Sequence, residues 1–121
     1  MYSEFHMPEH LSHGEYVDSA RRQVVETAQA MLDGRLSFLA GSRRLAALRD
    51  EVDVASSDAD FATFIAIESC TDALPVGEVR QYWSAEALAR LEPEIQSAQA
   101  WAAGVGSDAC RSLIAQFGES P

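Results

Sequence analysis

The sequence predicts an all-α protein of about five helices packed around one core, crossed by an irregular Leu-Pro-Val-Gly segment. Apolar residues recur at three- and four-residue steps along most of the chain. Ser and Asp, which favour helix N-caps, precede several of these stretches. A length of 121 residues with 47% hydrophobic composition suits a single core. We expect a flexible N-terminal segment at 1–16, one helical domain at 17–117 and a tail at 118–121.

The first 16 residues show no helical periodicity and hold all three histidines, His6, His10 and His13. On one continuous helix these side chains would share a face and could bind a metal ion. Pro8 interrupts such a helix and Gly14 ends it, which favours a loosely docked terminus over a metal site. We expect no metal ion or other cofactor.

Two helical stripes follow. The first begins near Asp18, with Asp18 or the following serine as N-cap, and ends at Gly34, which suits the positive φ of a helix C-terminus. The second runs over 36–52, but Gly41 and Ser42 fall inside it. We expect that helix to bend or restart there, with Ser42 as a cap.

The apolar run that begins at Phe61 predicts a helix with Asp58 or Asp60 as its N-cap. A strand over 62–67 stays open, because periodicity does not settle so short an apolar run. Pro75 ends this segment, and Gly77 suits the position of a type II turn that needs positive φ.

The C-terminal third predicts two further helices. Val79, Tyr82 and Trp83 fit one helical turn or an extended strip, with Trp83 as a lid over the core. Ser84 then caps a long helix reaching Trp101 or Ala102. That helix contains a proline, Pro93, which either kinks it or divides it.

The glycines at 104 and 106 are expected to end the long helix, and Ser107 or Asp108 to cap the last one, which runs to Phe117. Cys70 and Cys110 match no zinc or redox spacing. We therefore expect two free thiols that pack as small apolar residues.

The net charge of −10 comes from 19 acidic and 9 basic residues, and every basic residue is Arg. A field of this sign repels nucleic acid and anionic membranes and favours encounter with a basic protein. No apolar stretch approaches the roughly 18 residues of a membrane span, and the first residues lack a signal-peptide pattern. We expect a cytoplasmic protein. Six arginines lie in the first half, where internal pairing with the acidic half explains them best: Arg21, Arg22, Arg35, Arg43, Arg44 and Arg49.

The stretch between Arg49 and Arg80 contains no basic residue and eight acids. It is either a solvated loop and a helix whose first acids favour its dipole, or an electronegative docking surface for a partner. The candidate partner-binding residues are Asp50, Glu51, Asp53, Asp58, Asp60, Glu68, Asp72 and Glu78.

Glu68 and Asp72 lie one helical turn apart and face the same way. If buried, they would raise each other's pKa and could act as acid and base; if partly buried, they would pair with an arginine such as Arg80. Structural ion pairs are commoner than catalytic dyads, and we predict no catalytic residues. The alternative function is a small metal-dependent enzyme or metal-binding protein that uses these two carboxylates.

The stretches LDGRLSFLAGSRRLAALR (32–49) and FIAIESCTDALPVGEVRQYW (64–83), with the CRSLIAQF tail, resemble a group of short acidic bacterial proteins of uncharacterised function. The Ser-x-Thr-Asp run before the Leu-Pro-Val-Gly turn corresponds to Ser69, Thr71 and Asp72. Pro93 departs from that pattern, in which the long helix has no proline. The resemblance covers about three-quarters of the chain and implies a cytoplasmic helical protein of the immunity-protein kind.

These observations together predict a non-enzymatic protein-binding module. The most concrete form of this prediction is an immunity or antitoxin-type inhibitor that presents an acidic surface to a basic, toxin-like partner. Nucleic acid and membranes are not expected as partners.

Overall fold

The computed structural model describes residues 13–52 and 58–118, which form four α-helices and two short 3-10 helices. None of these residues forms a strand, so the all-α prediction is confirmed and the alternative strand over 62–67 is wrong. There are four α-helices rather than about five, because the two expected at the C-terminus are one. The α-helices are α1 (His13–Leu32), α2 (Phe38–Leu48), α3 (Ala59–Thr71) and α4 (Ala85–Gly118), and the 3-10 helices are η2 (Arg49–Glu51) and η3 (Gly77–Tyr82).

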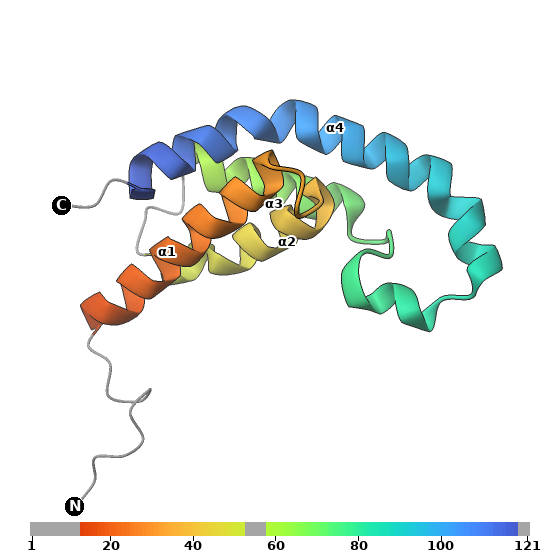
Figure 1. Ribbon diagram of the computed structural model, residues 1–121, viewed down its shortest axis with the longest axis horizontal. Coiled ribbons are helices and arrows are strands. Elements are labelled where there is room, and N and C mark those ends of the chain that lie inside the picture. Colours follow the sequence, from red (N-terminus) through yellow and green to blue (C-terminus); the bar gives the residue numbers. More distant parts are fainter. Residues whose placement is uncertain (1–12, 53–57, 119–121) are drawn as a thin grey trace, which may run out of the picture.

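Helix α4 arches over the other three α-helices (Figure 1). It packs against α1, α2 and α3, while α2 packs chiefly against α3. The core between them is apolar, and its largest fully buried side chains are Phe61, Phe64, Met31, Leu39, Leu45, Ile67 and Leu113.

Helix α1 begins at His13, five residues before the predicted start at Asp18. Val17 is buried in the core, and the Tyr16 hydroxyl donates a hydrogen bond of 2.8 Å to Glu51. The extra first turn of α1, residues 13–17, therefore makes contacts with distant parts of the chain. Residues 13–16 belong to α1, and residues 1–12, with the first two histidines, lie outside the described part. Gly34 has φ +81°, as predicted.

Helix α2 passes through Gly41 and Ser42 without a restart, so the predicted interruption is wrong. Its N-cap is Ser37, whose Oγ accepts a hydrogen bond of 3.1 Å from the amide of Ala40. Gly41 serves packing instead, because a Cβ there would lie 2.3 Å from Sδ of the buried Met31. The glycine lets the end of α1 and the start of α2 approach closely.

Helix α3 begins as predicted, with the Asp58 carboxylate accepting hydrogen bonds from the amides of Asp60 and Phe61. It ends at Thr71, ahead of Pro75, as expected. The type II turn is wrong, because among the described glycines only Gly34 has positive φ and Gly77 begins η3 instead.

Helix α4 is continuous over 34 residues and contains Pro93. Ser84 caps it as predicted, since its Oγ accepts a hydrogen bond of 3.0 Å from the amide of Ala87. The predicted end at the two glycines and the new cap at Ser107 are wrong. The Ser107 hydroxyl donates to the carbonyl of Ala103 inside the helix, at 2.7 Å.

Gly106 is a packing position rather than a helix end. It is buried, and a Cβ there would lie 3.3 Å from Cε1 of Phe64 and 3.4 Å from the ring of Phe38. Two phenyl rings, from α3 and α2, thus rest against the α4 backbone. Close packing of this kind requires the absence of a side chain, and it keeps the helix intact.

Two glycine substitutions test this account of packing. Gly41→Ala is expected to lower the free energy of unfolding by about 1–3 kcal/mol, because the buried Met31 side chain must move. Gly104→Ala is the matched control, since a Cβ there meets nothing within 4 Å. It should raise the free energy of unfolding by about 0.5–1 kcal/mol through helix propensity. Denaturant unfolding measures both, and a Gly41→Ala protein as stable as the unsubstituted chain would contradict the packing.

Candidate functional site

The candidate acids whose side chains the structure describes do not gather on one surface. Asp50 lies in η2 and Asp60 in the first turn of α3, whereas Asp72 caps the opposite end of α3. Those ends are about 20 Å apart, given a rise of about 1.5 Å per residue over 13 residues. Asp53 and the Glu78 side chain lie outside the described part.

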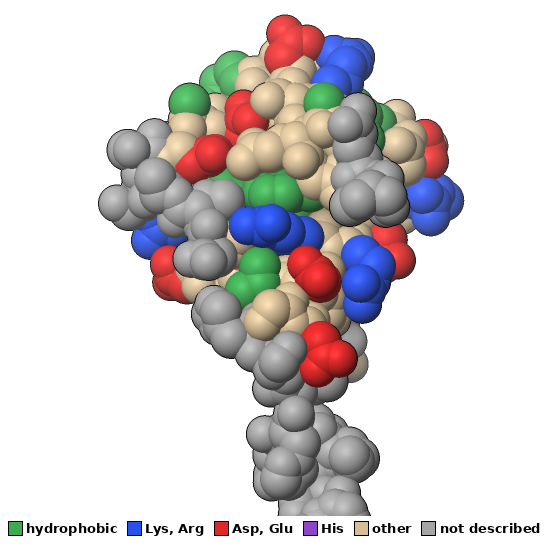
Figure 2. Space-filling view, turned by 90° about the vertical axis from the view of Figure 1, so that its left-hand side faces the viewer, with side chains coloured by type: hydrophobic (Ala, Val, Ile, Leu, Met, Phe, Trp, Pro, Cys, Tyr) green, Lys and Arg blue, Asp and Glu red, His purple; other side chains and the backbone are tan. Residues whose placement is uncertain are grey.

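Acids at the η2 end of the molecule are engaged within the protein. Asp50 pairs with Arg49 at 3.1 Å, and Asp60 accepts a hydrogen bond of 2.6 Å from the Ser112 hydroxyl. Glu51 accepts from the Tyr16 hydroxyl, and this hydrogen bond raises the pKa of Tyr16 above its usual value. Figure 2 shows this end, where acidic and basic side chains are interspersed. The face is mixed in charge.

Glu68 and Asp72 do not form an ion pair with Arg80, which lies 3.7 Å from Glu92 instead. Glu68 is half-buried and Asp72 is exposed at the C-terminus of α3. Among residues 13–52 and 58–118, no three His, Cys, Asp or Glu side chains are placed to hold a metal ion. No observation in the described part favours the metal-dependent alternative.

Two arginines of the first half bind backbone carbonyls rather than acidic side chains. Arg43 donates to the carbonyl of Thr71 and, at 3.0 Å, to that of Leu74. Arg21 donates to the carbonyl of Val52 at 3.1 Å. For these two residues, the predicted pairing with the acidic half is therefore wrong. Carbonyls at the ends of helices lack partners and carry partial negative charge, so they attract cations as carboxylates do.

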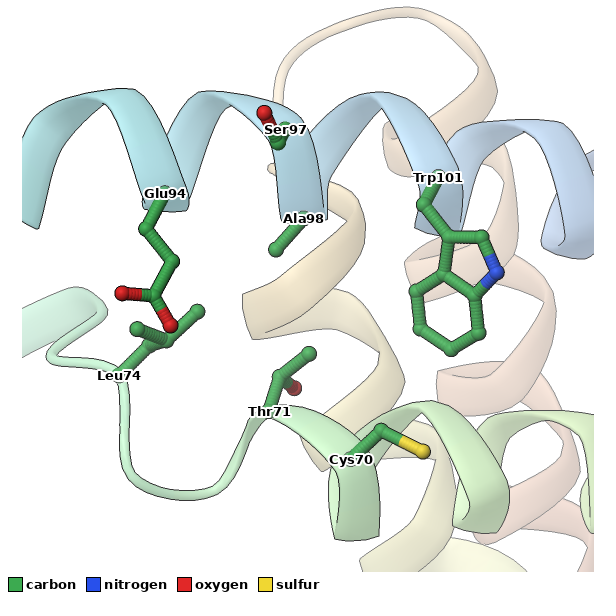
Figure 3. A pocket seen from close by; sticks show the side chains of 7 residues that line it. All are labelled: Cys70, Thr71, Leu74, Glu94, Ser97, Ala98 and Trp101. Carbon is green, nitrogen blue, oxygen red and sulfur yellow. The ribbon is translucent and has the colours of Figure 1, made fainter.

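A hollow of about 360 Å³ lies between the end of α3, the turn after it and the middle of α4 (Figure 3). Arg43 helps to form it, because its two carbonyl partners belong to residues of the wall. The hollow is lined by Cys70, Thr71, Leu74, Glu94, Ser97, Ala98 and Trp101.

The hollow has a carboxylate at one end and an aromatic ring at the other. The Glu94 side chain points toward Leu74, and the Trp101 indole projects from α4 toward α3, near the thiol of Cys70 (Figure 3). Cys70 is the one thiol among the lining residues, and none of them is a histidine, lysine or arginine that could activate it.

The sequence did not identify this site. The sequence marked Trp101 only as a possible end of the long helix, and its side chain is 44% exposed. The sequence does not mark Glu94 as a site residue, because a single acid on a polar helix face is also what a solvated helix shows. The seven residues come from segments 20 or more positions apart, so only the tertiary contact brings them together.

Trp83 is not a lid over the core, since it is 40% exposed, and Tyr82 beside it is 81% exposed. The η3 segment and the first turns of α4 extend beyond the bundle (Figure 1). The buried residues of α4 begin only at Ile95. Trp83 is therefore not one of the buried core residues.

The chain matches no family model, no curated protein and no solved structure in the comparisons made with each. Among the described residues, no helix is both long enough and apolar enough to cross a membrane. Function is therefore inferred from the chain's own geometry.

The role of Arg43 predicts a difference between neighbouring arginines. Arg43→Met should lower the free energy of unfolding by about 2 kcal/mol, because two carbonyls at the end of α3 lose a charged donor. Arg44→Met, at an exposed position of the same helix, should change it by less than about 0.5 kcal/mol. Denaturant unfolding measures both values. Equal effects of the two substitutions would show that the Arg43 bonds do not stabilise the turn.

The two thiols should differ in reactivity, because Cys70 is exposed and Cys110 is buried. Near pH 8, a chromogenic thiol reagent is expected to label one cysteine in the native protein and both after unfolding. Cys70→Ser should remove the native reaction. Rapid labelling of two thiols in the native protein would contradict the burial of Cys110.

Burial also makes Cys110 sensitive to alkali. It raises the pKa of this thiol from 9.0 to about 11, against a smaller opposing effect of Arg111. The unfolded chain therefore loses the proton first, and the stabilising contribution is lost as the pH rises from about 9 to 11. Stability measured across this range should fall less steeply in Cys110→Ala.

Proposed function

We propose that this protein is a non-enzymatic binding protein, of the immunity or antitoxin type, that associates with a basic protein. The observation that carries the proposal is the exposed apolar side of α4 in a chain of net charge −10. The charge selects a basic partner, and the apolar side chains supply contact area.

The exposed apolar side of α4 consists of Trp101 and Val105. These residues are 44% and 46% exposed. Positions four apart lie on one helix face, so the two side chains form a continuous strip. Trp101 also borders the hollow, which offers a partner an indentation as well as a ridge. The residues that contribute most to binding energy in interfaces are enriched in tryptophan, and in the complex they lie in well-packed pockets.

The charge acts through the field of the whole molecule. The candidate acids are spread over both ends of α3, and several have partners within the chain, so no single acidic patch supports the proposal. The excess of ten negative charges nevertheless attracts a basic protein from a distance and raises the association rate. Such attraction weakens as salt screens it.

The proposal is tested with a purified partner. Proteins of the protein's own host are captured on the tagged chain at low salt, identified by mass spectrometry, expressed separately and titrated by calorimetry. We expect one basic protein to bind in a 1:1 complex, with an affinity that falls at least about tenfold between about 50 mM and 500 mM salt.

Two tryptophan substitutions locate the contact. Trp101→Ala should weaken binding more than about tenfold, as an interface anchor would. Trp83→Ala, at the residue that follows η3, is the matched control and should have little effect. If no basic protein binds stoichiometrically, or if binding is indifferent to salt, the proposed function is wrong. If Trp83→Ala weakens binding and Trp101→Ala does not, the contact lies at Trp83, beside the end of η3, instead.

A further inference from the structure

We infer that the hollow beside Trp101 receives an arginine side chain of the basic partner, with its guanidinium group at Glu94. This inference rests on the proposed function and specifies where and how the partner is recognised.

Glu94 differs from the other acids of α4 because it has no arginine partner within the described residues. No hydrogen bond or ion pair joins it to another described residue, and its side chain points into the hollow (Figure 3). Three other acids of the same helix have arginine partners: Glu86 with Arg90 at 3.8 Å, Glu92 with Arg80 at 3.7 Å, and Asp108 with Arg111 at 2.6 Å. The hollow thus contains a negative charge that the described structure leaves unbalanced.

The rest of the hollow fits the stem of a long side chain. Ala98 lies between Glu94 and Trp101 on α4, and Leu74 lies opposite Glu94 on the turn after α3, so both add apolar surface to the lining (Figure 3). Glu94 and Trp101 are seven residues apart on α4, which corresponds to about 10 Å along the helix axis and to the same face. A side chain laid between them packs its methylene groups against apolar surface while its charged end reaches the carboxylate.

The chemistry of the carboxylate end favours arginine. The two oxygens of a carboxylate accept parallel hydrogen bonds from a guanidinium group, a geometry that an ammonium group does not match. At the opposite end, the Trp101 ring offers apolar surface to the methylene stem of the same side chain. Because Glu94 is exposed, water weakens an ion pair there, and the apolar contacts of the stem add to the binding.

A second copy of this chain also offers arginines, but two copies repel each other, since each has a net charge of −10. A basic protein satisfies both the local charge of Glu94 and the overall charge. Self-association through the hollow is accordingly an outcome that the experiment must distinguish, and sedimentation equilibrium does so.

The test uses capped arginine amide as the probe and its neutral isostere, capped citrulline amide, as the control. Binding is followed by Trp101 fluorescence in a Trp83→Phe protein, which leaves Trp101 as the one tryptophan. We expect saturable binding of the arginine probe and at least about tenfold weaker binding of citrulline. The indole N–H resonance of Trp101 should shift in the same titration.

Substitutions at two acids separate the local charge from the net charge. Glu94→Gln should weaken arginine binding at least about fivefold, whereas Glu26→Gln, an equal loss of charge at an exposed position of α1, should leave it unchanged. Both proteins are checked for unaltered unfolding midpoints. Equal binding of citrulline, equal effects of the two substitutions or the absence of saturation would overturn the inference. Tighter binding of a capped lysine amide would overturn the choice of arginine.

The outcomes also separate this inference from the proposed function. If a basic protein binds in a salt-dependent manner and Glu94→Gln leaves its affinity unchanged, the function stands and the inference is wrong. If the arginine probe saturates the hollow but no basic protein binds, the hollow recognises guanidinium and the protein-partner proposal is wrong. A dimer that Glu94→Gln dissociates would assign the hollow to a second copy and overturn the inference.

Discussion

The contact of two phenylalanine rings with the backbone of α4 at Gly106 determines much of this structure. Phe64 of α3 and Phe38 of α2 lie 3.3–3.4 Å from the position of an added Cβ, so this contact joins three helices at one point. Ala102 and Gly106 face the core. The residue before each of them is rotated by about 100° around the helix axis and therefore faces solvent. Trp101 and Val105 are those residues. The packing that builds the core therefore also exposes the apolar strip on which the proposed function depends.

The hollow follows from how α3 ends. Arg43 of α2 satisfies carbonyls at the C-terminus of α3 and in the turn, which places Thr71 and Leu74 opposite the middle of α4. The neighbouring acids of α4 are matched by arginines, whereas Glu94 faces the hollow without a partner in the described part. The lining combines a carboxylate, an indole, a thiol and apolar groups, and none of the lining residues is a histidine, lysine or arginine.

Errors in the predicted elements share one cause. Gly41 and Gly106 were interpreted by their conformational preferences, which favour turns and helix ends, yet both lie inside helices because another side chain needs the space. The start of α1 was placed too late for a related reason, since Tyr16 contacts Glu51 from a distant part of the chain. Trp83 was expected over the core because large aromatics are usually buried, but η3 extends beyond the bundle.

The sequence by itself determined the fold class, the caps at Asp58 and Ser84, the positive φ of Gly34 and the buried phenylalanines of α3, as well as the net charge. These features depend on residues within a few positions of each other, where hydrogen-bonding capacity and helical periodicity act directly. Only the tertiary structure decided that α4 and α2 are each uninterrupted. It also decided that Glu94, Leu74 and Trp101 line one hollow. They depend on contacts between helices, and side-chain volumes at those contacts outweigh local preferences because close packing leaves no room for alternatives.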